Sequence, residues 1–346
     1  MTDPPKDRID QAIENARRRA VPDPRLGVLE VERGAALGGV TTHRDTRDAL
    51  RRAAADAGLP VTIRLLPDDD PAARAAPAAV VTAALAPLLS APRAAGERVT
   101  EALHGETLAV LEVRGDWLRV RGADGYHAWV HSGYVATGSA EWGDDWNGRA
   151  TARALGAEVT AEDKRPLRLP EGARVALRRD GSVELADGRS ARVGAGVVQA
   201  EADLRSEALR TPAPEWALRR YAGAPYLWGG RTQWGIDCSG LAQAVYAARG
   251  VALPRDSDLQ AVTGREVPLS DDAAGYEVGD LLFFATGMRV DHVAIWAGAG
   301  RVVHAALSRG GVVTDDYFGE TPIGRRMRKE IVAVRRVYLP PNDAAK

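Results

Sequence analysis

The stretch GIDCSGLAQAVYAARG, residues 235–250, contains Cys238, the only cysteine among 346 residues. A helical pattern of apolar residues begins directly after it, through Leu241 and Val245, and ends at Gly250. We therefore predict a helix that carries Cys238 at its N-terminus. There the helix dipole and the unsatisfied N–H groups stabilise a thiolate and lower its pKa, as is typical of a nucleophile. The alternative is a buried free cysteine that acts as a small apolar side chain.

Two histidines follow in successive segments whose alternation is typical of strands. His292 lies in DHVAIWAG and His304 in VVHAAL, and six residues separate Gly298 from each of them. A hairpin that turns around Gly298 would place the histidines directly opposite each other, about 5 Å apart at Cβ. This pattern predicts Cys238 as nucleophile, His292 as base and His304 as the residue that orients the base. Histidines of the core and a zinc site are the alternatives, although one cysteine without close ligand spacing is poor for zinc.

The whole chain has the composition of a globular protein. It is 45% hydrophobic and 27% charged with a net charge of −1, which gives no reason to expect nucleic acid or an anionic membrane as partner. The N-terminal segment lacks the apolar core of a signal peptide, and no later run reaches the length of a membrane span. We therefore expect a cytoplasmic protein, and a lone thiol fits a reducing compartment.

The sequence divides into four predicted parts, and the whole is assigned to the α+β class. The first part has a charged helix, a strand-helix-strand pattern over 26–66 and a linker at 67–77. The second has short alternating runs with turn signals, typical of a small β-barrel, and the third is a degenerate second copy that follows a surface loop, EWGDDWNG. The last has a helix followed by an antiparallel sheet. The predicted boundaries are 1–78, 79–139, 140–205 and 206–346.

Six motifs over residues 212–338 resemble, in order, the NlpC-type papain-like cysteine peptidases of bacterial cell-wall peptides. The motifs are YLWGG, DCSG, LPRDSDLQ, GDLLFF, DHVAIW and VVHAAL. In the second predicted part, GDWLRV and GYHAWV resemble bacterial SH3-like domains. The resemblance implies a papain-like catalytic domain, with a helix packed on an antiparallel sheet, preceded by two small SH3-like barrels and a short N-terminal α/β segment.

The resemblance also implies roles for single residues. Cys238 would be the nucleophile, His292 the base and His304 the third polar residue, and the Tyr226 hydroxyl would help the Cys238 N–H to stabilise an oxyanion. Substrate polar groups would be held by three further residues, Asp237, Ser239 and Ser257. Two alternatives stay open: one takes Asp237 as a helix cap, and the other takes Arg255 and Asp256 as a solvated turn.

Two SH3-like domains before an NlpC-type domain resemble the γ-D-glutamyl-L-diamino acid endopeptidases that recycle cell-wall peptides. In that group the first SH3-like domain covers one end of the cleft and admits only a free N-terminal L-Ala. The matching positions here are Tyr126 and Glu101, and Trp228 would line the same pocket. Alternatively, Tyr126 and Trp129 belong to the barrel core and Glu101 is solvated.

The expected function is that of a cysteine endopeptidase acting through a thioester on Cys238. Its partners would be peptidoglycan-derived peptides of the form L-Ala-γ-D-Glu-diamino acid, with no nucleic acid, no membrane, no metal and no organic cofactor, and the protein would be a monomer. The alternatives are a cell-wall amidase or an acyltransferase on the same fold, or a non-catalytic wall-binding protein. The identity of the diamino acid and the length of the stem peptide stay open.

Overall fold

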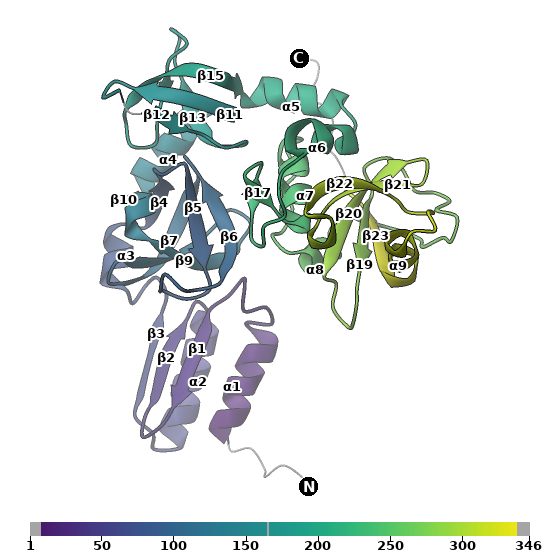
Figure 1. Cartoon of the computed structure of the whole chain (residues 1–346). Coiled ribbons are helices and arrows are strands. Elements are labelled where there is room, and N and C mark those ends of the chain that lie inside the picture. Colours follow the sequence, from purple (N-terminus) through teal and green to yellow (C-terminus); the bar gives the residue numbers. More distant parts are fainter. Residues whose placement is uncertain (1–7, 165, 338–346) are drawn as a thin grey trace, which may run out of the picture. The chain divides into compact units, whose positions relative to one another are not determined.

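The computed structural model describes residues 8–164 and 166–337, which fall into two compact units (Figure 1). Among the described residues, the first unit comprises 8–79, 89–96 and 107–144, and the second comprises 80–88, 97–106, 145–164 and 166–337. The second unit thus contains the catalytic region, the second barrel and two short segments of the first barrel region. The four boundaries predicted from the sequence stay a prediction.

A small α/β layer opens the first unit. It consists of α1 (Arg8–Arg19), β1 (Leu29–Arg33), β2 (Leu37–Thr41), α2 (Arg44–Asp56) and β3 (Val61–Leu65). The strand order is β1-β2-β3, with β1 antiparallel and β3 parallel to β2. The helices close the core through Ile9 and Leu50. The predicted strand-helix-strand pattern is confirmed. Strand β2 was not predicted, because it contains two glycines and glycine has a low strand propensity.

Two segments that were predicted to be irregular contain helices. The expected linker holds α3 (Pro71–Ala75), where the Asp70 carboxylate accepts a hydrogen bond from the Ala73 N–H at 2.9 Å and caps the helix. The expected surface loop is α4 (Ala140–Arg149), whose Trp146 is buried and donates its Nε1–H to the Gly105 carbonyl at 2.8 Å. Gly, Asp and Asn residues are typical of turns, so local composition was misleading where tertiary packing decides.

The strands of the first barrel region follow the order β10-β4-β7-β8-β9-β5-β6, where β6 is Arg98–Leu103. Strands β7, β8 and β9 form an antiparallel meander, in which Leu118 pairs with Val130. The predicted GDWLRV and GYHAWV strands are therefore confirmed. The bounds are β4 (Ala78–Val81), β5 (Leu85–Leu89), β7 (Thr107–Arg114), β8 (Trp117–Arg121), β9 (His127–His131), η1 (Ser132–Tyr134) and β10 (Val135–Gly138).

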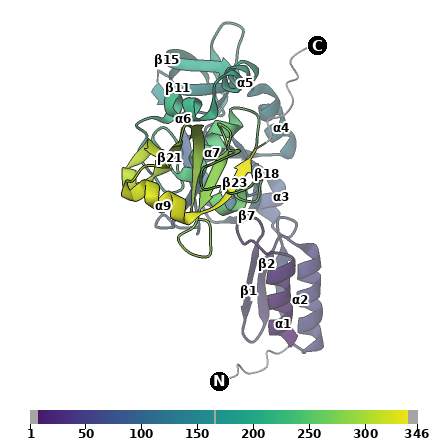
Figure 2. The same cartoon turned by 90° about the vertical axis from the view of Figure 1, so that its right-hand side faces the viewer.

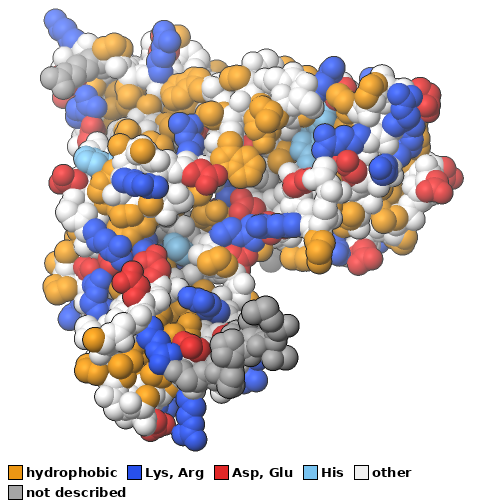
Figure 3. Space-filling view, turned by 60° about the horizontal axis from the view of Figure 1, so that its bottom comes forward, with side chains coloured by type: hydrophobic (Ala, Val, Ile, Leu, Met, Phe, Trp, Pro, Cys, Tyr) orange, Lys and Arg blue, Asp and Glu red, His pale blue; other side chains and the backbone are white. Residues whose placement is uncertain are grey.

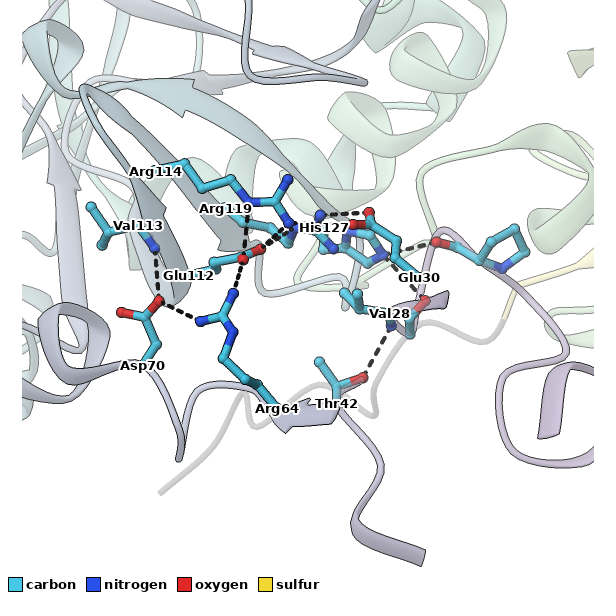
Figure 4. A network of polar contacts seen from close by, with 12 residues as sticks. Val28, Glu30, Thr42, Arg64, Asp70, Glu112, Val113, Arg114, Arg119 and His127 are labelled. Carbon is cyan, nitrogen blue, oxygen red and sulfur yellow. Dashed lines mark hydrogen bonds and ion pairs between the residues drawn. The ribbon is translucent and has the colours of Figure 1, made fainter. Parts of the chain in front are cut away.

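A buried carboxylate joins the α/β layer to this meander. The Glu112 side chain is fully buried in β7 and accepts hydrogen bonds from Arg64 at 2.6 Å and from Arg114 at 3.0 Å. Arg119 lies 3.4 Å from the same carboxylate and also pairs with Glu30 of β1 at 2.5 Å. Figure 4 shows the three guanidinium groups converging on Glu112. A buried carboxylate is stable only when such partners compensate its lost hydration.

The second barrel closes on itself within the second unit. Its strands run in the order β12-β11-β13-β14-β15, and β11 also pairs antiparallel with β15, from Ala152 with Ala200 to Ala161 with Ala191. The predicted second β-rich part is therefore a small barrel, and its description as a degenerate copy of the first stays a prediction. The bounds are β11 (Ala152–Ala161), β12 (Pro166–Arg168), β13 (Arg174–Leu177), β14 (Val183–Glu184) and β15 (Ser190–Ala200), and α5 (Glu201–Arg210) follows.

The C-terminal region, residues 206–337, is built on a six-stranded antiparallel sheet with helices on both faces. The strand order is β18-β23-β19-β20-β21-β22. Helices α6 and α7 pack on one face through residues such as Leu241 against Phe283, and α9 packs on the other through Met327 against Trp296 (Figures 1 and 2). This is the predicted α+β arrangement.

Its elements have the following bounds: α6 (Ala213–Tyr221), β16 (Arg231–Thr232), β17 (Gly235–Ile236), α7 (Cys238–Ala247), α8 (Ser257–Gln260), β18 (Arg265–Val267), β19 (Leu281–Phe284), β20 (His292–Gly298), β21 (Arg301–Ala306), η2 (Leu307–Arg309), β22 (Gly311–Asp316), α9 (Pro322–Glu330) and β23 (Ile331–Arg336). Residues 338–346 of the predicted last domain lie outside the described residues. Among the helices that the structure describes, none has the length and apolarity needed to cross a membrane. Figure 3 shows basic and acidic side chains interspersed on the visible face, in keeping with the net charge of −1.

Candidate active site

Cys238 is the first residue of α7, as predicted. Asp237 is the N-cap, and its Oδ1 atom accepts a hydrogen bond from the Gly240 N–H at 2.7 Å. The capping alternative for Asp237 is therefore confirmed. Because the cap satisfies the third helical N–H, the Cys238 N–H at the helix start has no intrahelical acceptor and can face a substrate oxygen.

The Cys238 thiol lies against the start of β20. Its sulfur receives hydrogen bonds from the backbone N–H groups of Val293 and Ser239, and the side chain is buried. Val293 directly follows His292 in the chain. The fold therefore brings the predicted nucleophile to the predicted base, which sequence spacing alone did not do.

The protonation states of this pair differ from the expectation. Burial, followed by the negative charge of Asp237, raises the pKa of Cys238 to about 12, against the predicted lowering. Loss of hydration outweighs the helix N-terminus, the two N–H donors and Arg255. Burial, followed by the charges of His304 and Arg326, lowers the pKa of His292 to about 3. The resting pair is thus a neutral thiol and a neutral imidazole, and the thiolate forms as His292 takes the proton.

A chain of hydrogen bonds fixes the tautomer of the base. His292 Nε2 lies 2.7 Å from His304 Nδ1, and His304 Nε2 lies 3.0 Å from Asp315 Oδ2. The Asp315 carboxylate can only accept, so His304 Nε2 donates to it and His304 Nδ1 accepts from His292 Nε2–H. This leaves Nδ1 of His292 as the nitrogen that can take the thiol proton. The hydrogen bond from His304 keeps the pKa of Asp315 low, so its negative charge persists.

The predicted register of the two histidines was wrong by two residues. The hairpin turns at Ala299 and Gly300, Gly298 pairs with Arg301, and an irregularity follows Trp296. Ile295 pairs with Val303, and the same register places His304 opposite Ala294 rather than His292. The histidines are therefore diagonal neighbours. Because an offset of two residues preserves the face of the strand, their side chains still meet.

Asp315 is the site residue that the sequence prediction missed. It lies in β22, where Val313 pairs with His304, so Asp315 is again a diagonal neighbour on the same face. The available signal was the alternating segment GVVTDD, which follows the His304 strand after a Gly-Gly turn. In a strand paired with the His304 strand, an acidic residue two positions beyond the residue opposite His304 lies on the same face as the histidine. That rule would have identified Asp315.

Tyr226 lies at the same site. Its N–H bonds to the Gly310 carbonyl at 2.9 Å, and it forms a bridge with Ile236 beside the start of α7. Burial, followed by the charges of Cys238 and Asp237, raises the pKa of the Tyr226 phenol. The hydroxyl therefore keeps its proton and can donate a hydrogen bond.

Arg255 contradicts the expectation of a solvated turn. Its side chain is 1% exposed, and its guanidinium donates to both Asp237 oxygens, at 3.1 and 2.6 Å, and to Ser239 Oγ at 2.8 Å. A buried guanidinium needs such a carboxylate partner. Asp237 and Ser239 thus have partners within the protein, and their contact with substrate stays a prediction. Ser257 is buried at the start of α8, and its role also stays a prediction.

The three residues of the expected amine pocket have different surroundings. Glu101 is 2% exposed in β6 (Arg98–Leu103), where it accepts hydrogen bonds from Arg98 Nη1 at 2.9 Å and from the Arg231 N–H at 3.0 Å. The solvated alternative for Glu101 is therefore wrong, and burial raises the pKa of its carboxyl. Tyr126 is buried in the first unit, as is Trp129, whereas Trp228 is exposed. Their part in a substrate pocket stays a prediction.

In the described part of the chain, no group of three or more His, Cys, Asp or Glu side chains is arranged to hold a metal ion. The ring nitrogens of His304 and one nitrogen of His292 are already engaged in the hydrogen-bonded chain.

Comparison with known proteins agrees with this geometry. Residues 223–334 match the NlpC/P60 family, and residues 88–133 match the bacterial dipeptidyl-peptidase SH3 domain. The catalytic region is an NlpC/P60 domain. The resemblance drawn from the six motifs is confirmed for this domain.

Three relatives show how far the likeness extends. A γ-D-glutamyl-L-lysine dipeptidyl-peptidase of Bacillus subtilis is 35% identical over 34% of this chain and 38% of its own length. The protein of the same name from Bacillus cereus is 29% identical over 60% of this chain and 66% of its own. Dipeptidyl-peptidase 6 of Lysinibacillus sphaericus is 29% identical over 72% of this chain and 94% of its own length. The chain thus spans less than two thirds of the first two relatives.

A solved structure shows the same fold. It is the crystal structure of an NlpC/P60 family protein from Bacillus cereus. The alignment covers 76% of this chain and 100% of that protein's chain, with a TM-score of 0.62 and 23% sequence identity.

Proposed function

We propose that the NlpC/P60 domain hydrolyses the γ-D-glutamyl-L-diamino acid bond of peptidoglycan stem peptides that carry a free N-terminal L-Ala. The observation that carries the proposal is the hydrogen-bonded chain from His292 through His304 to Asp315, with Cys238 beside the residue that follows His292, in a domain of this family. The names of the relatives, which specify γ-D-glutamyl-L-lysine and a dipeptidyl-peptidase, support the bond and the release of a dipeptide.

The reaction is an acyl transfer in two steps. His292 Nδ1 takes the thiol proton as the Cys238 sulfur attacks the γ-carbonyl of D-Glu. The Cys238 N–H and the Tyr226 hydroxyl stabilise the oxyanion. The carbon–nitrogen bond then breaks, and His292 returns the proton to the departing amine. Water, deprotonated by His292, hydrolyses the thioester and restores the thiol.

Asp315 and His304 support the base during both steps. When His292 becomes an imidazolium, its Nε2–H still donates to His304, which in turn donates to the Asp315 carboxylate. The chain stabilises the positive charge and prevents rotation of the ring. No metal or organic cofactor enters these steps.

The requirement for a free amine would rest on Glu101 and Trp228, as the resemblance implies. A buried carboxylate such as Glu101 suits an α-ammonium, because each charge compensates the hydration lost by the other. In intact peptidoglycan the L-Ala nitrogen is acylated by the sugar. A free amine therefore marks fragments already released from the glycan, and we propose recycling of such fragments in the cytoplasm, by a monomeric enzyme, as the setting.

The test uses paired peptides. L-Ala-γ-D-Glu-L-Lys and L-Ala-γ-D-Glu-meso-diaminopimelate are each prepared with a free and with an acetylated L-Ala, and products are identified by mass spectrometry. We expect the wild type to release L-Ala-γ-D-Glu from the free peptides only, and the Cys238→Ala variant to release nothing. Equal cleavage of the acetylated peptides would remove the free-amine requirement and keep the peptidase. No cleavage of any peptide would contradict the proposal and favour an amidase, an acyltransferase or a binding protein.

A further inference from the structure

The Arg255 guanidinium has a fourth contact, outside the NlpC/P60 domain. Its Nε–H donates to the Thr100 hydroxyl at 2.8 Å, and Thr100 is 5% exposed. Thr100 lies in β6, inside the segment that matches the SH3 domain, yet this strand belongs to the second unit together with Arg255. The acceptors of this buried cation are thus divided between the NlpC/P60 domain and the segment that matches the SH3 domain.

Arg255 donates hydrogen bonds to both residues that flank the nucleophile, Asp237 and Ser239. It binds the two carboxylate oxygens of Asp237 and the hydroxyl of Ser239. Asp237 in turn caps α7 and accepts the Gly229 N–H at 2.9 Å. The first turn of α7, which carries the Cys238 sulfur and N–H, is therefore held by one planar guanidinium, whose orientation Thr100 completes.

A second set of contacts keeps Thr100 in place. Arg231 of β16 donates its N–H to the Glu101 carboxylate at 3.0 Å and its Nη1–H to the Glu101 carbonyl at 2.7 Å. The same guanidinium pairs with Glu106 at 2.9 and 3.1 Å. Since Glu101 directly follows Thr100, these bonds fix β6 beside the segment that leads into α7.

We propose that Thr100 is a positioning residue for the nucleophile, and that strand β6 of the SH3-like domain orients Cys238 through Arg255 in addition to any contact with substrate. In the Thr100→Val variant the Arg255 Nε–H loses its buried acceptor. The guanidinium then shifts out of the orientation in which it binds Asp237 and Ser239, and the first turn of α7 is held less firmly. The reaction would then lose alignment of the sulfur and of the oxyanion donor, while ground-state binding of the peptide stays as it was.

The experiment compares Thr100→Val with Thr100→Ser, which keeps the hydroxyl, and with Thr46→Val, which removes a similarly buried hydroxyl from α2. Hydrolysis of L-Ala-γ-D-Glu-L-Lys gives kcat and KM, iodoacetamide labelling gives the reactivity of Cys238, and Tm reports folding. We expect Thr100→Val to lower kcat about tenfold with KM unchanged, because the guanidinium that holds the first turn of α7 is left with an unsatisfied buried donor. The rate of Cys238 labelling should fall as well. Thr100→Ser and Thr46→Val should match the wild type in kcat and in the rate of labelling.

The outcomes separate this inference from the proposed function, on which its kinetic part rests. A lower Tm with wild-type kcat and labelling in Thr100→Val would overturn the positioning role. If wild type cleaves no peptide but labelling still slows in Thr100→Val and recovers in Thr100→Ser, the proposed function fails and the positioning role holds. Should Thr100→Val not fold, Thr100→Ala, which places no methyl group against the guanidinium, takes its place with the same expected results.

Discussion

At the scale of the residue, the site depends on a neutral Cys238–His292 pair. The sequence correctly predicted which residues take part, because a cysteine before a helix and two histidines in adjacent strands are visible in the spacing. It did not predict the resting charges, since these depend on burial that only the fold establishes. The thiolate is therefore a transient species formed by transfer to His292, and not a stable ion at neutral pH.

Alkylation of Cys238 measures this directly. With a pKa of about 12, the thiolate fraction stays small at neutral pH, so the rate of iodoacetamide labelling should keep rising through the alkaline range that the fold tolerates. Glutathione is the control and should level off above the ordinary thiol pKa of about 8.5. A plateau for Cys238 below neutral pH would show a stable thiolate–imidazolium pair and contradict the neutral resting state.

At the scale of the element, strand register decides which side chains meet. The motifs predicted α7, β19, β20 and β21. The irregularity after Trp296 moved His304 from a direct to a diagonal neighbour of His292, and such a shift cannot be read from alternation. Strand β22 was not among the predicted strands although GVVTDD alternates, so its Asp315 was missed even though it completes the hydrogen-bonded chain.

The Asp315→Asn variant tests the end of that chain. An amide cannot stabilise the imidazolium and can reverse the donor order, so we expect kcat to fall about tenfold to a hundredfold with KM unchanged. Asp316→Asn is the matched control, because Asp316 is the exposed neighbour that bonds the Phe318 N–H at 2.9 Å. Steady-state kinetics on L-Ala-γ-D-Glu-L-Lys checks both. Equal activity of the two variants would exclude Asp315 from the site.

At the scale of the whole molecule, charged contacts connect segments that the sequence presents as separate modules. The module boundaries were predicted from composition, whereas the pairing of Glu112 with Arg64 and Arg119 depends on tertiary proximity that no local pattern contains. The same holds for Thr100 and Arg255, which are 155 residues apart in the chain.

Glu112→Gln should destabilise the first unit. It leaves the surrounding guanidinium groups without their buried anion, and we expect the free energy of unfolding to fall by about 3 kcal/mol. Urea unfolding followed by tryptophan fluorescence provides the measurement. The control is Glu32→Gln, at an exposed position of β1, which should change stability by less than about 0.5 kcal/mol. A similar effect of both substitutions would show that the Glu112 contacts contribute no more than a surface charge.

The most direct test of the central claim is to trap the acyl group that Cys238 transfers. Wild type and Cys238→Ala are incubated with L-Ala-γ-D-Glu-L-Lys and hydroxylamine, and the products are identified by mass spectrometry. A thioester on Cys238 would be intercepted, so we predict the γ-hydroxamate of L-Ala-D-Glu together with free lysine from wild type, and neither from Cys238→Ala. Release of lysine by Cys238→Ala at the wild-type rate would contradict Cys238 as the nucleophile.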